Sequence, residues 1–555
     1  MLTFLRFSAF LGAMILLAFG FSASDEQADL FWLACLGGAG VLLAMAWWPR
    51  NTRTLPIFNR TLLRWATIIL VCFALVTVQL VRVQIVESSR TIARVGQAPN
   101  GEVVVNPRVR LKALEMQRGR ILDRDGRVLA DTIQREDGTY QRTYPELATG
   151  PLIGYYSPQI YGSSNIELEF EEYLSGEDGG NPAEEWLNGI LHEDTRGYDL
   201  GLTVDFELQQ QAVDLLAGRP GAVVLMDAES GALLAMAGEP LYDPNQLYAN
   251  EGQLNAEQAA AVQNYWALLN ADENAPLVFR PTQGLYTPGS TFKMVTSTAY
   301  LDTGEGDLAT VFRDEGILEV DGRVIEEANR PDPNKVDYTI EESFAYSLNV
   351  VYAQLSLQVG SQTLWDYATK FGFGEQIPFD FYTSEGTQVA SSRETLNNRA
   401  LLADTGFGQG EILTSPLQMA MVAAAIENGG EMPRPYVVET VLDGDGDVLE
   451  RFGGDTWRRV MHAETAESMR ALLQASAEYG GAQGIDIDGV TTGGKTGTAE
   501  IGDGESHAWF VGFAEANDRK LVVAVIVERG GRGAETALPI GRVMLTAGIA
   551  NTTAP

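Results

Sequence analysis

The sequence predicts a membrane anchor of two or three helices, followed by an α+β region built around an antiparallel sheet. Two observations lead to this fold class. Three apolar stretches open the chain, at residues 7–23, 30–48 and 65–81. Further along, strand-like segments lie near residue 221 and again near residue 527, with mostly helix-like sequence between them. Such strands must pair across a long interval, and the helices between them must pack on the resulting sheet.

The composition restricts the chemistry that this chain performs. Its 555 residues carry a net charge of −35, from 39 basic and 74 acidic residues, with three histidines and two cysteines. Such an acidic chain repels polyanions, which disfavours nucleic acid as a partner. Cys35 and Cys72 lie inside the apolar stretches, so no cysteine nucleophile is available in water. With so few histidines a histidine-rich metal site is disfavoured, and we expect proton transfers that do without histidine. No metal and no cofactor are expected.

Length decides which of the apolar stretches can span a membrane, because a bilayer-spanning helix needs about 20 apolar residues, or about 17 at the short end. The second and third stretches meet this length and the first is borderline. Arg6 precedes the first stretch, acidic residues follow it, and four arginines precede the third, namely Arg50, Arg53, Arg60 and Arg64. The positive-inside rule places the N-terminus in the cytoplasm and everything after Val81 outside. A cleaved signal peptide over residues 1–24 is the alternative for the first stretch.

The exported region begins loop-rich and then changes to regular elements. Residues 123–126 (Asp-Arg-Asp-Gly) predict a turn between two short strands, because Asp and Gly suit turn dihedrals. Residues 203–216 predict a capped helix. Residues 221–227 predict an apolar strand that a turn at 228–231 reverses into residues 232–237. Residues 508–513 and 521–527 predict two more strands.

One helix has an unusually clear start. Ser415 is placed as the N-cap, Pro416 occupies the first helical position, and Gln418 is expected to complete a capping box. Gly429 is expected to end this helix.

A serine and a lysine lie three residues apart at the start of another predicted helix, in residues 286–297 (YTPGSTFKMVTS). Ser290 and Lys293 then share a helix face, so the amine can take the hydroxyl proton. The helix N-terminus adds positive potential where an alkoxide would develop. Lys293 must be partly neutral for this, which burial and a second nearby cation would achieve. An ordinary helix start with a solvent-facing lysine is the alternative.

Two further motifs are weaker when each is taken alone. Residues 493–500 (GGKTGTAE) predict a glycine-rich strand in which Lys495 with the hydroxyls of Thr496 and Thr498 would suit a carboxylate. A glycine-rich turn with a solvent lysine is the alternative there. Ser347 and Asn349 flank one apolar residue and would aim a hydroxyl and an amide into a cleft. Residues 163–165 have the same Ser-x-Asn form, so this signal needs support from the others.

The joint order Ser-x-x-Lys, Ser-x-Asn, Lys-Thr-Gly is the motif set of penicillin-binding proteins and class A β-lactamases. The chain resembles a class B (monofunctional) penicillin-binding protein over about residues 110–545. Four other segments also resemble that class: residues 118–130 (RGRILDRDGRVLA), 221–237 (GAVVLMDAESGALLAMA), 407–410 (FGQG) and 507–513 (HAWFVGF). The resemblance implies a transpeptidase fold, with helices on both sheet faces and a helical subdomain, on a loop-rich pedestal.

The resemblance also implies the roles of the motif residues. Ser290 would attack the D-alanyl-D-alanine carbonyl, with Lys293 as its general base. Ser347 would relay the proton to the leaving amine, and Asn349 would hold the substrate amide. The terminal carboxylate would be bound by the Lys-Thr-Gly strand, namely Lys495, Thr496, Gly497 and Thr498. The backbone N–H groups of Ser290 and Thr498 would form the oxyanion hole.

The same resemblance implies three domains: an anchor at residues 1–87, a pedestal at 88–205 and a transpeptidase domain at 206–555. The expected partners are peptidoglycan stem peptides, lipid-linked precursors, β-lactams, the bacterial cell membrane, and a polytopic glycosyltransferase of the elongation or division machinery. The class usually has a single span, so two or three spans depart from its pattern. No glycosyltransferase domain is expected within the chain, because residues 95–210 are too few for one beside the pedestal.

Two alternatives to transpeptidation remain open. The acyl-enzyme could be resolved by water, as in a D,D-carboxypeptidase or a β-lactamase. The anchor and the motif at residues 118–130 disfavour this alternative. The chain could instead be a non-catalytic β-lactam sensor or a divisome scaffold. A sensor needs a cytoplasmic output domain, and the only inside segment of any size is expected at residues 49–64.

Overall fold

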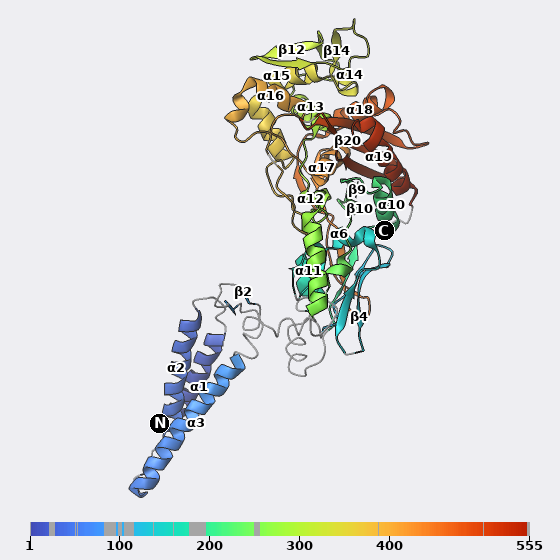
Figure 1. The fold of residues 1–555 in the computed structure, drawn as a ribbon. Coiled ribbons are helices and arrows are strands. Elements are labelled where there is room, and N and C mark those ends of the chain that lie inside the picture. Colours follow the sequence, from blue (N-terminus) through green and yellow to red (C-terminus); the bar gives the residue numbers. More distant parts are fainter. Residues whose placement is uncertain are drawn as a thin grey trace. The chain divides into compact units, whose positions relative to one another are not determined.

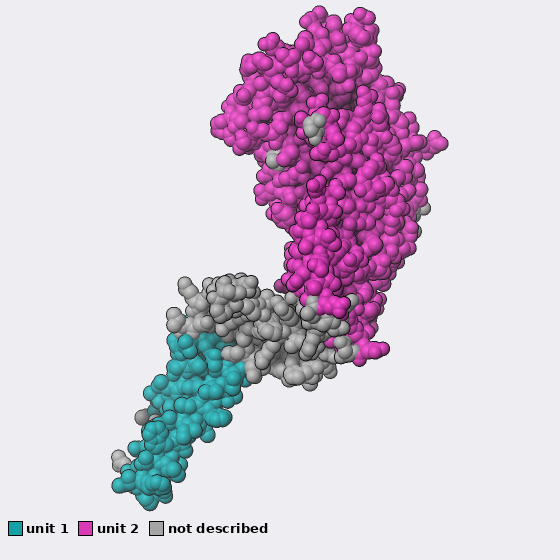
Figure 2. Space-filling view, in the orientation of Figure 1, with its two compact units in different colours: residues 1–113 teal, residues 114–555 magenta. Residues whose placement is uncertain are grey.

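The computed structural model describes residues 2–21, 28–49, 52, 54–82, 96–97, 103–104, 116–136, 138–158, 160–176, 196–248, 256–386, 388–502 and 504–551. The chain divides into two compact units, residues 1–113 and 114–555 (Figure 2). The first unit holds three apolar helices, and the second holds the large sheets with their helices (Figure 1).

The three apolar helices are α1 (Leu2–Phe21), α2 (Ala28–Trp47) and α3 (Ile57–Val81). Helix α2 packs against both α1 and α3. Glycines allow a close approach at the α1–α2 contact, where Gly12 faces Leu42. The indole N–H of buried Trp32 donates to Gln79 Oε1 at 2.6 Å, which links α2 to α3. A short strand pair follows, β1 (Gly96–Gln97) with β2 (Val103–Val104).

Helix α3, with 25 residues, is the one helix among the described residues that is long and apolar enough to cross a membrane. It begins at Ile57 rather than at residue 65, so Arg60 and Arg64 lie on its first turns. The first two predicted spans also coincide with helices, but for α1 and α2 the crossing stays a prediction. The proposed cleavage site at residues 22–24, together with Arg50 and Arg53, lies outside the described residues.

The second unit is built around a five-stranded antiparallel sheet with the order β10-β9-β21-β20-β19. Strands β9 (Gly221–Asp227) and β10 (Leu233–Glu239) form the predicted hairpin. Strands β19 (Thr491–Glu500), β20 (Ser506–Ala516) and β21 (Arg519–Val527) come from the other end of the chain. The pairing of β9 with β21 therefore confirms a sheet assembled from segments distant in sequence.

Helices cover both faces of this sheet, which explains why β9 and β21 are buried along nearly their whole length. Helices α10 (Phe206–Leu216) and α19 (Gly533–Ala550) contact each other and the sheet. Helices α17 (Pro416–Glu427) and α18 (Ala463–Tyr479) form the other contacting pair. The predicted cap of α10 is confirmed, because the Asp205 carboxylate accepts from Leu208 N at 3.1 Å.

The predicted start of α17 is confirmed in part. Ser415 Oγ accepts from Gln418 N at 3.2 Å, and Pro416 is the first helical residue. The capping box is wrong, because the Gln418 amide donates to Phe371 O instead of returning to the helix start. In a capping box the Gln418 side chain would instead accept from the Ser415 N–H. The helix ends at Glu427, and Gly429 follows with a φ of 60°.

A second sheet has the order β17-β16-β8-β3-β4-β5. Strands β3 (Ile121–Leu122), β4 (Val128–Gln134), β5 (Tyr140–Thr143) and β8 (Asp199–Leu202) come from the N-terminal part of the unit. Strands β16 (Val438–Leu442) and β17 (Val448–Arg451) come from a much later part. The predicted turn at residues 123–126 is confirmed by the Gly126 N to Asp123 O bond at 3.1 Å. This sheet joins both sides of the expected boundary at residue 205, which stays a prediction.

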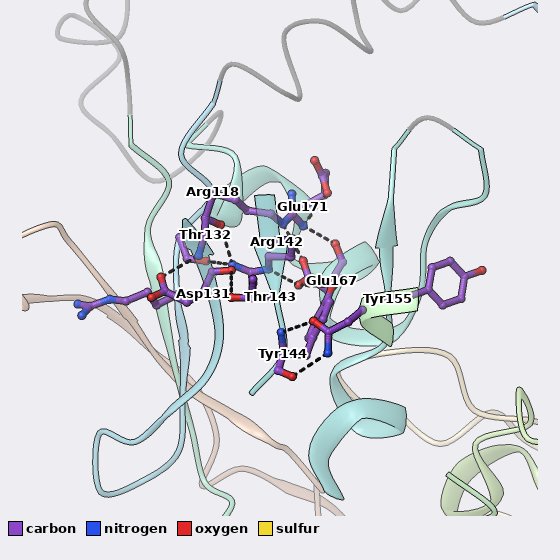
Figure 3. A network of polar contacts seen from close by, with 12 residues as sticks. Arg118, Asp131, Thr132, Arg142, Thr143, Tyr144, Tyr155, Glu167 and Glu171 are labelled. Atoms are coloured by element: carbon purple, nitrogen blue, oxygen red, sulfur yellow. Dashed lines mark hydrogen bonds and ion pairs between the residues drawn. The ribbon is translucent and has the colours of Figure 1, made fainter. Parts of the chain in front are cut away.

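A buried ionic network lies beside this second sheet (Figure 3). The Glu167 carboxylate receives Arg118 Nε and Arg142 Nε, each at 2.6 Å, and the Tyr144 hydroxyl at 3.0 Å. All three charged side chains are at most 2% exposed. Arg118 also pairs with Glu171 at 2.7 Å. Burial alone would raise the pKa of Glu167, but Arg142 and Arg118 outweigh burial and lower it.

A further group of helices carries the site residues and packs against β19 and α18. They are η4 (Gly289–Phe292), α13 (Lys293–Asp302), α14 (Ile340–Ala345), α15 (Asn349–Lys370, with a break at Gly360) and α16 (Arg399–Gly406). Short strand pairs complete the unit: β6 (Tyr156–Ser157) with β7 (Gly162–Ser163), β11 (Val311–Arg313) with β14 (Asp337–Thr339), β12 (Ile317–Val320) with β13 (Arg323–Glu326), and β15 (Glu431–Pro433) with β18 (Thr456–Arg459). The remaining helices are η2 (Leu147–Thr149), α6 (Gly150–Ile153), α7 (Asn165–Glu169), α8 (Glu171–Leu174), η3 (Pro244–Leu247), α11 (Ala256–Ala271), α12 (Arg280–Gln283) and η5 (Thr395–Asn397).

Glu427, at the end of α17, is buried away from the network of Figure 3. Neither of its carboxylate oxygens has a hydrogen-bond partner within the described ranges, and Arg470 Nε lies 3.5 Å away. Burial raises the pKa of Glu427 from 4.5 to about 8; Arg470 and Lys520 lower it and Glu515 raises it further. The folded chain thus holds this proton more tightly than the unfolded chain does. Its contribution to stability must fall as the pH rises from about 4.5 to about 8.

We therefore expect Glu427→Gln to stabilise the protein at alkaline pH. The variant and the wild type should melt at similar temperatures near pH 5, and the variant should gain a few kcal/mol, to order of magnitude, near pH 9. Thermal unfolding across this pH range measures the difference. Glu467→Gln, at an exposed position on α18, is the control. A difference that does not depend on pH would contradict a buried, protonated Glu427.

Candidate active site

Ser290 lies in the single turn η4, which leads directly into α13 and so carries the serine at the front of a helix. The serine is half-buried. Gly289, with a φ of 54°, allows the chain to pass close to β19: a Cβ there would lie 3.2 Å from Ala499. Gly497 makes the reciprocal approach, because its Cβ would lie 3.1 Å from Pro288 O. The backbone of β19 therefore runs directly beside the turn that presents Ser290.

Lys293 is fully buried and its amine has three acceptors. Lys293 Nζ donates to Ser347 O at 2.7 Å, to Asn349 Oδ1 at 2.8 Å and to Ser347 Oγ at 3.1 Å. In the described part of the chain, no hydrogen bond joins this amine to Ser290 Oγ. The amine thus rests on the Ser-x-Asn motif, and the two motifs that are distant in sequence meet in space.

Ser347 occupies a strained turn between α14 and α15. Its φ is 64°, a conformation that costs about 1–3 kcal/mol for a residue other than glycine. Leu348 and Asn349 then start α15, with Leu348 buried beneath. The turn brings Ser347 Oγ, Ser347 O and Asn349 Oδ1 to one side, facing Lys293. Strain of this kind is common where a side chain must be aimed at a reaction.

Lys495 reaches the same hydroxyl from β19. It is fully buried, and its Nζ donates to Ser347 Oγ at 2.9 Å and to Thr496 O at 3.1 Å. Ser347 Oγ therefore accepts from two lysines at once, which uses both of its lone pairs. The hydrogen of this hydroxyl then points away from both lysines and can be donated to another group. Phe344 lies 5.7 Å from Lys495 Nζ, and Tyr352 lies 5.0 Å from Lys293 Nζ.

Both lysines are less basic than usual. Burial and the charge of Lys495 lower the pKa of Lys293 well below its ordinary value, and Glu327 raises it in part. Burial lowers the pKa of Lys495 to about 7. A neutral Lys495 is therefore accessible near neutral pH, and burial likewise favours the neutral form of Lys293. A buried neutral amine beside a hydroxyl is a competent general base.

The threonines of the Lys-Thr-Gly strand face the opposite side from Lys495 and differ in their contacts. Thr496 Oγ1 donates to Gly481 O at 3.1 Å, so its proton is engaged by the loop after α18. Thr498 is exposed, and its Oγ1 accepts from Gly533 N at 3.4 Å, which leaves the hydroxyl proton free to donate. The structure thus brings together Ser290, Lys293, Ser347, Asn349 and Lys495, with Gly497 and the two threonines along the adjoining strand.

Sequence reasoning missed two residues of this region. Glu327 and Asn329 follow β13 and contact the Ser347 turn from outside all three motifs. The sequence carried no signal for them, because the N-cap position of α15, Leu348, which has no capping side chain, is known only from the structure.

Comparison with known proteins agrees with this geometry. Residues 221–545 match the family described as the penicillin binding protein transpeptidase domain. The chain belongs to this family. Residues 118–200 match the penicillin binding protein A dimerisation domain. The fold is thus that of a class B penicillin-binding protein, in which a transpeptidase domain follows an N-terminal dimerisation region.

Named relatives and solved structures give the same result. Peptidoglycan D,D-transpeptidase PbpA of Mycolicibacterium smegmatis is 32% identical over 464 residues, which cover 80% of this chain and 91% of the relative. MrdA of Escherichia coli, a peptidoglycan D,D-transpeptidase, is 28% identical over 421 residues, which cover 69% of this chain and 64% of the relative. The imipenem acyl-enzyme complex of penicillin-binding protein A from M. tuberculosis has a TM-score of 0.72 at 29% identity, and covers 80% of this penicillin-binding protein and 100% of that chain. The D,D-transpeptidase domain from Eggerthella lenta has a TM-score of 0.67 at 32% identity, with coverages of 79% and 99%.

Proposed function

We propose that this penicillin-binding protein is a serine D,D-transpeptidase that cross-links peptidoglycan stem peptides and is acylated by β-lactams. One observation carries the proposal: two buried lysines with lowered pKa values converge on Ser347 Oγ beside the turn that presents Ser290. This arrangement supplies a nucleophile, a base and a proton donor without histidine or metal. Relatives named D,D-transpeptidases and an acyl-enzyme complex among the similar structures support it.

In the acylation step, Ser290 Oγ attacks the carbonyl carbon between the two D-alanines while its proton passes to neutral Lys293. The tetrahedral intermediate is held by the backbone N–H groups of Ser290 and Thr498. When this intermediate collapses, the carbon–nitrogen bond breaks and D-alanine leaves as an amine. Ser347 donates the proton that this amine needs and is reprotonated by Lys293, whose Nζ lies 3.1 Å from Ser347 Oγ.

In the transfer step, the acceptor amine attacks the ester carbonyl and loses a proton along the same path. The new peptide bond forms and Ser290 Oγ leaves as an alcohol, so the enzyme returns to its first state. Asn349 holds the substrate amide. The terminal carboxylate of the donor binds beside Lys495, Thr496, Gly497 and Thr498, and the free hydroxyl of Thr498 suits this role best.

The cellular setting that we propose follows from the first unit. Helix α3 anchors the chain in the membrane, and α1 and α2 form two further spans of the anchor. The arginines between α2 and α3 keep that loop in the cytoplasm and place the transpeptidase domain outside. The division into an anchor at 1–87, a pedestal at 88–205 and a transpeptidase domain at 206–555 belongs to this proposal. The substrates there are stem peptides made from lipid-linked precursors, and a polytopic glycosyltransferase is the partner that the extra spans would contact.

Product analysis tests the proposal against hydrolysis and against a sensor. The full chain, in detergent, is incubated with a stem peptide that ends in D-alanyl-D-alanine and with an acceptor amine. We expect a cross-linked product and free D-alanine in equal amounts. Free D-alanine without cross-linked product would indicate a carboxypeptidase. Stable acylation by penicillin without any turnover of the peptide would indicate a sensor or scaffold.

A further inference from the structure

A short segment outside the three motifs holds the turn that carries Ser347. Residues 327–329 (Glu-Ala-Asn) follow β13, in the insertion that separates α13 from α14. Figure 1 shows the strands of this insertion, β12 and β14, beside α14 and α15. The Glu327 N–H donates to Gly316 O at 2.9 Å, which fixes the start of the segment to the β12–β13 hairpin. The segment is therefore tethered before it reaches the site.

The Glu327 carboxylate caps helix α15 from this separate segment. Glu327 Oε2 accepts from Val350 N at 3.0 Å, and its other oxygen accepts from Asn329 N at 2.9 Å. Leu348, the residue at the N-cap of α15, makes no side-chain cap of its own. A carboxylate at a helix N-terminus satisfies an otherwise unpaired N–H and is favoured by the helix dipole. Glu327 thus does what an N-cap side chain ordinarily does.

Asn329 contacts the same turn on its other side. Its amide Nδ2 donates to Ser347 O at 3.2 Å. The same carbonyl accepts from Lys293 Nζ at 2.7 Å. Two side chains therefore hold the Ser347 turn: Asn329 donates to the Ser347 carbonyl, and Glu327 caps the helix that follows. A turn with a φ of 64° needs such outside contacts to stay in place.

Glu327 also supplies negative charge to a site that has two buried amines. Neither Lys293 nor Lys495 forms an ion pair with a carboxylate among the described residues. Burial and Lys495 lower the pKa of Lys293, and the charge of Glu327 opposes them. The other titratable groups that face Lys293 are Lys495 on β19 and Tyr352 on α15. Burial raises the pKa of Tyr352, so it is neutral and adds no charge.

We propose that Glu327, assisted by Asn329, is a positioning residue for acyl transfer: it fixes the Ser347–Asn349 turn and balances the charge of the Lys293 amine. This inference rests on the proposed function, because its readout is the acylation of Ser290. Two separable effects follow. The charge of Glu327 raises the pH at which Lys293 becomes neutral, against the larger effects of burial and Lys495, and the hydrogen bonds of Glu327 and Asn329 affect the rate once Lys293 is neutral.

The test is the pH profile of acylation by a fluorescent penicillin, measured on the full chain in detergent. Glu327→Gln keeps one acceptor oxygen, for Val350 N, but removes the charge and the acceptor for Asn329 N. Without that charge the protonated amine is less favoured, so the acidic limb of the profile should move to lower pH, while the plateau falls less than in Glu327→Ala. Glu327→Ala should move the limb in the same direction and lower the plateau by about 10-fold to 100-fold. Asn329→Ala should lower the plateau without moving the limb.

Glu326→Gln is the matched control, since this neighbouring carboxylate is exposed and lies on β13. It should leave both limb and plateau unchanged. An acidic limb in Glu327→Gln at the wild-type pH overturns the inference, and this variant decides the matter even if Glu327→Ala does not fold. If the wild type itself is not acylated, the proposed function fails; if it is acylated and Glu327→Gln titrates with it, only this inference fails.

Discussion

Replacement of Ser290 by alanine is expected to abolish covalent labelling of this chain by a fluorescent penicillin. Cross-linking of a stem peptide should fall by about 10⁴-fold or more, because no other group in the site forms the ester. None of the contacts that Lys293 and Lys495 make with Ser347 involves Ser290, so the rest of the site is expected to stay in place. The loss therefore lies in the chemical step. Gel fluorescence after labelling measures the first effect, and quantified cross-linked product measures the second.

A control must separate the loss of the nucleophile from damage to the turn. Thr287→Ala removes a neighbouring half-buried hydroxyl and should retain labelling. The melting temperature of Ser290→Ala should equal that of the wild type within the error of the measurement, since Ser290 is only half-buried. Residual labelling of Ser290→Ala, mapped by mass spectrometry to another residue, would show that the nucleophile has been misassigned.

Short sequence patterns predicted many of the strands and helices and several of the site residues. The strand at Gly221–Asp227 was predictable because it is an unbroken apolar run that ends in a turn, and both faces of β9 are indeed covered. Ser290 and Lys293 lie in one short motif, so their joint presence on one helical segment followed from spacing alone. The meeting of Lys495 with Ser347 did not follow from spacing. It was expected only because the order of the motifs resembles a known family.

Contacts that join distant segments carried no local signal. The pairing of β8 with β16 joins residues about 240 positions apart, for example Leu200 with Val441, and neither strand indicates its partner. The capping box at Gln418 failed because the Gln418 side chain donates to Phe371 O, at the end of another helix, and does not pair with the Ser415 N–H. Glu327 was missed because its role depends on a contact with a distant segment, the start of α15, where it accepts from Val350 N. The sequence therefore predicted elements and motifs formed by neighbouring residues, but not contacts between segments that are distant in sequence.

Replacement of Glu167 by alanine is expected to destabilise the second unit by about 3–5 kcal/mol. Glu167 is fully buried and is the shared partner of Arg118 and Arg142. Its removal leaves two guanidinium groups in the interior, of which Arg118 alone keeps a second carboxylate, Glu171. Uncompensated buried charge is far more costly than the loss of an exposed pair. Thermal unfolding of the full chain in detergent measures the effect as a drop of several degrees in the melting temperature.

Two further variants show that charge, rather than shape, explains this destabilisation. Glu167→Gln keeps the side-chain volume and one acceptor oxygen but still leaves the guanidinium charges unbalanced, so it should fall between the wild type and Glu167→Ala. Glu315→Ala removes the carboxylate of an exposed pair with Arg313, where both side chains are more than 60% exposed, and should leave the melting temperature close to that of the wild type. The pKa of Glu167 is lowered on folding, so its contribution is present near neutral pH and is lost only as the pH falls below the ordinary carboxyl range. A Glu167→Ala variant that is as stable as Glu315→Ala at pH 7 would show that the two arginines find other partners, and that the network of Figure 3 does not hold this sheet together.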